Sequence, residues 1–253
     1  MTRTTDILYC HCAGCEATPP KVKRAVLAGI VASGLRFEAV ADLCELAARG
    51  EQTLRRQTLR RLAQRPGVKV VACFPRAVRW LFDAAGAPLR SDAQIFNMRA
   101  QRADEILRQL GRRGAASKKK AEPLETLCAR LEAPQPDRWI PWFPVIDRDR
   151  CGNCKQCLSF CLFGVYALNG SDAVEVRNPA CCKTNCPACA RVCPQAAIIF
   201  PKYGAAPING GEAGDDQAQK VKIDPHTLAA GDVYEKLRAR AAAMRTPQDG
   251  VTE

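Results

Sequence analysis

The first part of the chain alternates short apolar runs with amphipathic stretches of helical period. Apolar residues recur at helical spacing from Val22 to Val31, directly after Pro19-Pro20, and this stretch stops at Gly34. Proline in a first turn and glycine after a last turn are typical helix boundaries. Val68–Phe74 is instead apolar at every position except Lys69 and is rich in β-branched residues, as a buried parallel strand should be. Strands are predicted at Asp6–Tyr9, Leu35–Val40, Val68–Phe74 and Ala93–Met98, and helices from Pro20 to Gly34, over 51–64, over Pro75–Ala85 and over 100–110.

Strands that alternate with helices of this length form βαβ units around a parallel sheet. The predicted fold class is an α/β amino-terminal domain with a parallel sheet, a small α+β domain that begins with a strand at Val145–Asp147, and a helical tail. A basic linker with a short helix near Leu124–Leu131, and a strap rich in Pro and Trp, separate the two domains. The predicted boundaries are 1–112 for the α/β domain, 113–144 for the linker and strap, 145–205 for the second domain, and 206–253 for a loop and a tail with one helix in Asp224–Arg245.

Cysteine is the residue type whose abundance changes this picture. The chain has 15 cysteines and only 2 histidines, His11 and His226, among its 253 residues. In a reducing cytosol such a density indicates metal sites rather than disulfides, and a zinc protein here would have to use thiolates almost alone. The polar start and the lack of a long apolar run predict a cytoplasmic protein that does not span a membrane.

Two cysteine runs have the spacing of iron–sulfur ligands. The first is Cys151-x2-Cys154-x2-Cys157-x3-Cys161, and the second is Cys186-x2-Cys189-x3-Cys193-Pro194. This segment resembles two-cluster bacterial ferredoxins, in which the fourth cysteine of each run ligates the other run's [4Fe–4S] cluster. The resemblance implies a first cluster on Cys151, Cys154, Cys157 and Cys193, and a second on Cys161, Cys186, Cys189 and one further cysteine.

The last ligand of the second cluster is out of register. The regular spacing points to position 183, which is occupied by Lys183. Cys182, one residue away, is the preferred candidate, and Cys181, two residues away, is the alternative. A pair of zinc knuckles is the competing interpretation, but runs in this register without histidine are typical of cubane ligands.

Four amino-terminal cysteines fall near the ends of predicted strands. Cys10 ends the first strand and is two residues from Cys12, Cys44 follows the second strand, and Cys73 lies near the end of the third. Ligands gather at the carboxyl ends of parallel strands, so these thiols could converge and hold a third cluster. A single buried cysteine is often only a small apolar residue. Two thiols as close in the sequence as Cys10 and Cys12, however, are poorly explained as residues that only fill the hydrophobic core.

Short segments of this region resemble the amino-terminal domain of the heterodisulfide reductase A subunit. They are Tyr9-Cys10-His11-Cys12, Val70–Arg76 with Leu81-Phe82, and Asn97-Met98-Arg99. The resemblance implies a [4Fe–4S] cluster on Cys10, Cys12, Cys44 and Cys73, with Cys15 as an alternative to Cys12. Phe74 stands where that family has serine, and no Gly-x-Gly-x-x-Gly follows a strand, so neither flavin nor nucleotide is expected in this chain. Cys128 and Cys181 remain unassigned.

Clusters without a nucleophile–base pair or a phosphate loop predict an electron-transfer protein. We expect a subunit of a multi-subunit oxidoreductase that relays single electrons to or from a flavin-containing or other catalytic subunit. Residues 1–120 carry 23 Lys and Arg against 10 Asp and Glu, and such a cationic surface would steer the chain toward an acidic docking face. Nucleic-acid binding through Arg55–Arg65 is less favoured, because a solvated helix face explains the run. The alternative function is a stand-alone thiol or disulfide redox enzyme that uses the amino-terminal cysteines, so the sequence leaves open whether the chain is itself an enzyme.

Overall fold

The computed structural model describes residues 7–48, 54–111, 122–132 and 141–212. These residues all belong to one compact unit of the chain. The helix predicted within Asp224–Arg245 lies outside the described residues, as do residues 112–121 of the basic linker.

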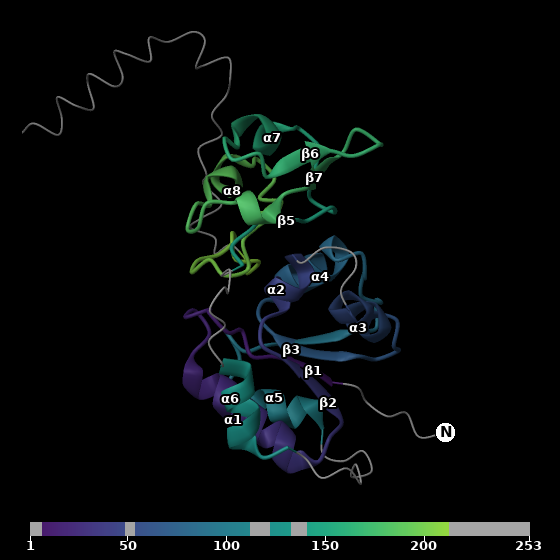
Figure 1. Ribbon diagram of the computed structural model, residues 1–253, viewed down its shortest axis with the longest axis vertical. Helices are drawn as coiled ribbons and strands as arrows, with labels where there is room; N and C mark the ends of the chain where they lie inside the picture. Colours follow the sequence, from purple (N-terminus) through teal and green to yellow (C-terminus); the bar gives the residue numbers. More distant parts are fainter. Residues whose placement is uncertain (1–6, 49–53, 112–121, 133–140, 213–253) are drawn as a thin grey trace, which may run out of the picture. The chain divides into compact units, whose positions relative to one another are not determined.

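A parallel sheet with the strand order β2–β1–β3–β4 forms the centre of the first part of the chain (Figure 1). Ile7 of β1 pairs with Phe37 of β2 and with Lys69 of β3, and Lys69 in turn pairs with Gln94 of β4. The predicted α/β fold class is therefore confirmed. The strands are β1 (Ile7–Cys10), β2 (Phe37–Val40), β3 (Lys69–Ala72) and β4 (Gln94–Asn97).

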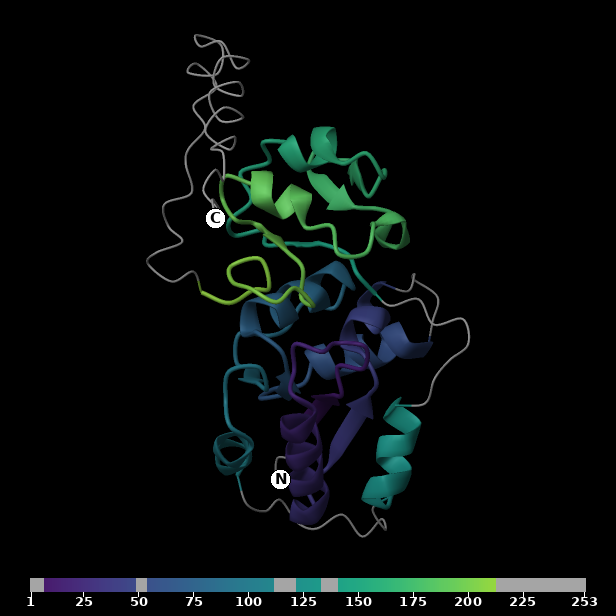
Figure 2. The ribbon, with the colours of Figure 1, turned by 90° about the vertical axis from the view of Figure 1, so that its left-hand side faces the viewer.

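Helices cover both faces of this sheet. In Figure 1, α1, α5 and α6 lie on one face, and α2, α3 and α4 lie on the other. Figure 2 shows α1 between α5 and α6. A strand covered on both faces must be apolar throughout, which is why all four residues of β1 are buried. The helices are α1 (Pro20–Ser33), α2 (Leu43–Ala48), α3 (Leu54–Ala63), α4 (Pro75–Ala84), α5 (Ala103–Leu110) and α6 (Leu124–Glu132).

The short helix α2 is the element that the hydrophobic pattern misses. Its first turn is capped by Asp42, whose Oδ1 accepts hydrogen bonds from the backbone N–H groups of Cys44 (2.9 Å) and Glu45 (3.4 Å). An aspartate before an apolar run is a recognised start signal, so Asp42 could have revealed this helix. By contrast, α1 and α4 begin at prolines as predicted, and α1 is followed by Gly34 with φ of 68°. Because only two residues separate the end of β2 from the start of α2, Cys44 is held close to the carboxyl end of that strand.

The cysteine-rich second part contains two small antiparallel strand pairs with short helices. Val145 pairs with Ile199, and Tyr166 pairs with Val176. This arrangement confirms the predicted α+β class for that part. Its elements are β5 (Val145–Ile146), α7 (Gln156–Phe160), β6 (Tyr166–Leu168), β7 (Val174–Val176), a 3-10 turn (Pro179–Cys181), α8 (Ala188–Val192) and β8 (Ile198–Ile199).

Basic side chains of the α/β part bind the backbone and a carboxylate of the second part. Arg76 on α4 pairs with Asp147 at 2.5 Å and also donates to the backbone carbonyl of Ala196. Val145 and Ile199, which pair in the second part, belong to the same hydrophobic core as the parallel sheet. The two parts are therefore packed together through apolar contacts and held by at least one buried ion pair.

Candidate functional site

The loop between Cys151 and Cys157 gathers thiols of the first cysteine run. Asn153 adopts a left-handed conformation (φ 51°), which asparagine tolerates well and which turns the loop back before α7. Burial raises the pKa of Cys157 to about 11, and the nearby thiols of Cys189, Cys193 and Cys151 add to the rise. Cys154 lies exposed in the same loop. Cys157 therefore lies near one other cysteine of the first run, Cys151, and near two cysteines of the second run, Cys189 and Cys193.

Cys161, immediately after α7, lies with the cysteines of the second run. Burial raises the pKa of Cys182 to about 12, and the nearby Cys189, Cys161 and Cys186 thiols add to this effect. The same four cysteines line one cavity. Cys181, in contrast, is exposed and is not part of that lining. Of the two candidates for the irregular position, the structure brings Cys182 and not Cys181 to the other three cysteines.

Each run thus places its last cysteine with the thiols of the other run. Cys161 from the first run lies with Cys186 and Cys189 around one cavity, while Cys193 from the second run, together with Cys189, lies near enough to Cys157 to raise its pKa. This crossed arrangement is the one that two-cluster ferredoxins use to connect their cubanes.

Two hydrogen-bond donors at these thiols were not identified from the sequence. The Tyr166 hydroxyl donates to Cys189 Sγ at 3.1 Å, and the backbone N–H of Ala197 donates to Cys193 Sγ at 3.3 Å. Tyr166 is buried, and burial raises its pKa well above the ordinary value. Hydrogen bonds to ligand sulfur are one means by which a protein sets cluster potentials, so both donors belong to the candidate site.

A third group of cysteines lines a cavity at the carboxyl edge of the parallel sheet. Cys10 is the last residue of β1, and Cys73 directly follows β3. These two strands are neighbours, and the chain runs from β1 to one edge of the sheet and from β3 to the other. Such a switch point is where open parallel sheets bind ligands. We call this group the front cavity, and its cysteines are Cys10, Cys12, Cys15, Cys44 and Cys73.

The thiols of the front cavity are buried and close to one another. Cys10 Sγ lies 3.5 Å from Cys12 Sγ and accepts a hydrogen bond from the backbone N–H of Leu43 at 3.2 Å. Burial raises the pKa of Cys73 to about 12, Cys10 adds to the rise, and Arg99 opposes it. A thiol with a raised pKa keeps its proton at neutral pH, so metal binding here must release protons.

Lys202, from the second part of the chain, reaches into the lining of the front cavity. Its ammonium group forms an ion pair with Asp42 and donates to the backbone carbonyl of Ala13 at 3.1 Å. Burial alone would lower the pKa of Lys202, but the neighbouring Cys44 and Asp42 outweigh burial and raise it. The sequence analysis did not identify Lys202 as a site residue.

Lys23 is a second buried ammonium group at the same site. It lies on α1 and donates to the backbone carbonyls of Cys12 and Cys15, each at 3.0 Å. The described residues include no carboxylate that forms an ion pair with it. Lys23 therefore brings a positive charge to the loop that carries two of the front cysteines.

The remaining candidate side chains lie outside these groups. His11 Nε2 is 3.0 Å from Glu132 Oε1, and His11 Nδ1 is 3.3 Å from the Tyr9 hydroxyl, so its ring is engaged on both sides. Cys128 on α6 belongs to the hydrophobic core. His226 lies outside the described residues.

The donor type of all three cysteine groups fits [4Fe–4S] clusters, which are held by thiolates. Among the described residues, no three Cys, His, Asp or Glu side chains are arranged to share a single metal ion. A [4Fe–4S] cubane does not require its ligands to share one ion, because each thiolate binds a separate iron atom. Four of the thiols around each of the two cysteine-lined cavities could therefore serve one cluster without converging on a point.

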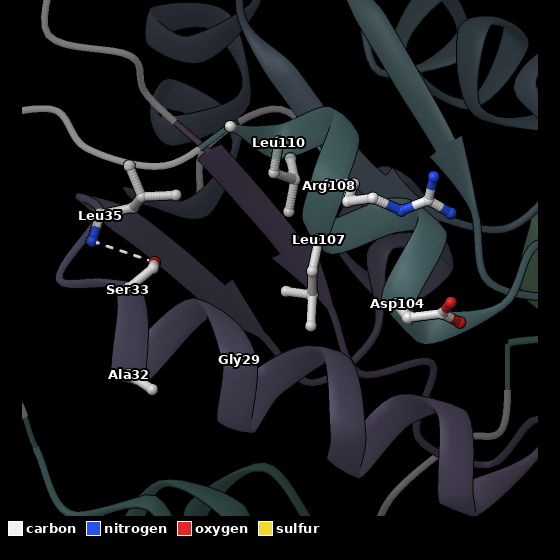
Figure 3. Close-up of a pocket in the computed structure, with 9 residues that line it drawn as sticks. Gly29, Ala32, Ser33, Leu35, Asp104, Leu107, Arg108 and Leu110 are labelled. Carbon is white, nitrogen blue, oxygen red and sulfur yellow. Dashed lines mark hydrogen bonds between the residues drawn. The ribbon is translucent and has the colours of Figure 1, made fainter.

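Another cavity, between α1 and α5, is lined without any cysteine (Figure 3). Figure 3 shows Leu107 of α5 directed toward α1 near Gly29. A Cβ atom on Gly29 would lie only 2.3 Å from Leu107 Cδ1, so glycine permits the close approach of the two helices. This cavity reflects the packing of α1 against α5 and offers no thiol to a metal.

Comparison with known proteins supports a ferredoxin-like segment. No family model matches this chain. A protein of Methanocaldococcus jannaschii described as an uncharacterized ferredoxin is 52% identical to the chain over 64 residues. The match covers 24% of this chain and 42% of that relative, so the chain spans less than half the relative's length. The resemblance of residues 1–110 to the heterodisulfide reductase A subunit finds no support in these comparisons. Among the described residues, none of the helices combines the length and the apolar character that a bilayer crossing requires.

Proposed function

We propose that this protein is an iron–sulfur electron carrier with three [4Fe–4S] clusters. Clusters of this type exchange single electrons at potentials that the surrounding protein sets. The proposed ligands are Cys151, Cys154, Cys157 and Cys193 for the first cluster, Cys161, Cys182, Cys186 and Cys189 for the second, and Cys10, Cys12, Cys44 and Cys73 for the front cluster.

The observation that carries the proposal is the crossed grouping of the two cysteine runs. Cys182 lies with Cys161, Cys186 and Cys189, although it is one residue out of register in the sequence. A shared ligand function explains both the spacing and the convergence.

The chain's own residues would set the environment of each cluster. Burial lowers the local dielectric, and the N–H and O–H groups that donate to thiol sulfur stabilise negative charge there. The front cavity has such a donor in the N–H of Leu43, and the second part has them in Ala197 and Tyr166. These donors orient the ligands as well as tune them.

We infer that the chain works as an electron-transfer subunit of a larger oxidoreductase. Its formal net charge is +12, and a cationic carrier associates fastest with an acidic partner surface. A flavin-containing or other catalytic subunit would then carry out the chemistry.

Iron and labile sulfide per chain, measured on protein prepared without oxygen, test the proposal. Three clusters require about 12 of each, and two clusters require about 8. Colourless protein that contains zinc in place of iron would contradict it.

The Cys73→Ala variant is expected to lose the front cluster alone, because its thiol is buried in the front cavity. Iron should fall from about 12 to about 8 per chain, with the spectra of the two ferredoxin-type clusters unchanged. Cys128→Ala is the matched control, since it removes an equally buried cysteine of the hydrophobic core. Equal iron contents in both variants would refute the front ligand set.

A thiol or disulfide redox enzyme is the second candidate function. The front cavity has five cysteines, and a cubane uses four, so Cys15 is left as a free thiol beside the cluster. Turnover of a disulfide substrate by the chain alone, with an artificial electron donor, would favour this function. Such turnover should then disappear in Cys15→Ser.

A further inference from the structure

We propose that Lys202 is a positioning residue of the front cluster, supplied by the ferredoxin-like part of the chain. It links two of the segments that carry front cysteines, the loop after β1 and the start of α2, and places a positive charge beside them. The inference rests on the proposed function, because it requires a cluster in the front cavity.

Lys202 connects one loop that precedes α1 in the chain with another that follows it. One loop follows β1 and carries Cys12, and Lys202 donates to the carbonyl of Ala13 in that loop at 3.1 Å. The other follows β2, and Lys202 pairs there with Asp42, which in turn accepts the backbone N–H of Cys44 at 2.9 Å. One ammonium group is therefore hydrogen-bonded to both ligand loops.

The segment that carries Lys202 is itself held in place by the α/β part. Arg99 donates to the backbone carbonyls of Pro201 at 3.0 Å and Tyr203 at 2.8 Å, the residues on either side of Lys202. The guanidinium of Arg99 also lies 5.0 Å from the ring centroid of Phe74, the neighbour of Cys73. Lys202 is thus a fixed element of the site rather than a flexible surface lysine.

Burial strengthens the electrostatic effect of the Lys202 charge on the front cavity. The side chains of Lys202 and Asp42 are 7% and 2% exposed, so solvent and salt screen their charges poorly. Removal of the cation would leave the Asp42 carboxylate beside the cluster and make the site more negative. A more negative surrounding disfavours the addition of an electron, so the reduction potential of the front cluster should fall.

The test compares Lys202→Met with Lys202→Arg and with Lys21→Met in the full-length protein. Lys21 is an exposed lysine of α1, so its replacement removes the same charge without touching the front cavity. A redox titration followed by electron paramagnetic resonance would identify the front cluster as the signal that Cys73→Ala lacks. At a fixed potential, Lys202→Met should lower the ratio of reduced to oxidised front cluster about tenfold, which is ~59 mV for a one-electron couple.

Rescue and the behaviour of the other clusters complete the test. Lys202→Arg should restore most of the ratio, and the two ferredoxin-type signals should not move in any variant. Loss of the front signal alone in Lys202→Met, with about 8 irons remaining, would equally support a positioning role. The proposal is overturned if Lys202→Met matches Lys21→Met in iron content and potential, or if all three clusters are lost together. About 8 irons in the unaltered protein would instead refute the front cluster itself, before any variant is compared.

Discussion

Replacing Cys182 by alanine is expected to lower the iron content of the protein from about 12 to about 8 per chain. Cys182 lies with Cys161, Cys186 and Cys189 around one cavity, and a cubane that loses one of its four protein ligands is destabilised. The absorbance and paramagnetic signals of the second cluster should disappear while those of the first remain. Iron, sulfide and the reduced-state spectrum of anaerobic protein measure this outcome.

Cys181→Ala provides the matched control, because it removes the adjacent thiol from an exposed position. This variant should keep about 12 irons and an unchanged spectrum. A result in which Cys181→Ala loses iron and Cys182→Ala keeps it would reverse the assignment. If each single variant keeps its iron and only the double variant loses it, the two thiols replace one another, and the exclusive role of Cys182 is wrong.

The parallel sheet was predictable because its strands have a strong local signature. Val70 and Val71 are fully buried, as the apolar run that follows Lys69 in β3 indicated. The boundaries of α1 could also be predicted from the sequence, because proline and glycine act through backbone geometry that does not depend on tertiary contacts. The start of β2 was harder to predict from the sequence. The strand begins at Phe37 and not at Leu35, because its ends are decided by pairing with β1.

The front cavity was predictable in its cysteines but not in its cations. The order of strands and helices alone brings Cys10 and Cys73 to one edge of the sheet. The pairing of Lys202 with Asp42 joins residues separated by 160 positions, and no local pattern marks either residue as a partner of the other. The sequence already preferred Cys182 over Cys181 as a ligand, and the structure adds that Cys182 lines the cavity whereas Cys181 is exposed and outside its lining.

Replacement of Arg76 by methionine is expected to destabilise the protein by about 3 kcal/mol, because it leaves a buried carboxylate without its main partner. The side chains of Arg76 and Asp147 are 11% and 4% exposed, and their ion pair joins α4 to the residue after β5. Arg76 also satisfies the carbonyl of Ala196, which would lose a donor. Arg150 lies 3.6 Å from Asp147 and is more exposed, so it offsets only part of the loss. Urea unfolding of the anaerobic protein, followed by near-ultraviolet circular dichroism, measures the change.

An exposed ion pair of the same part of the chain supplies the control. Arg61 pairs with Glu38 across α3 and β2, and their side chains are 56% and 38% exposed. Arg61→Met should therefore cost less than about 1 kcal/mol, since solvent screens such pairs. Arg76→Lys should fall between the two, because lysine keeps the charge but lacks the several fixed donors that reach Asp147 and Ala196 together. Equal losses in Arg76→Met and Arg61→Met would mean that the buried pair contributes no more to the junction than a surface contact does, and that apolar packing of Val145 and Ile199 against the sheet holds the two parts together instead.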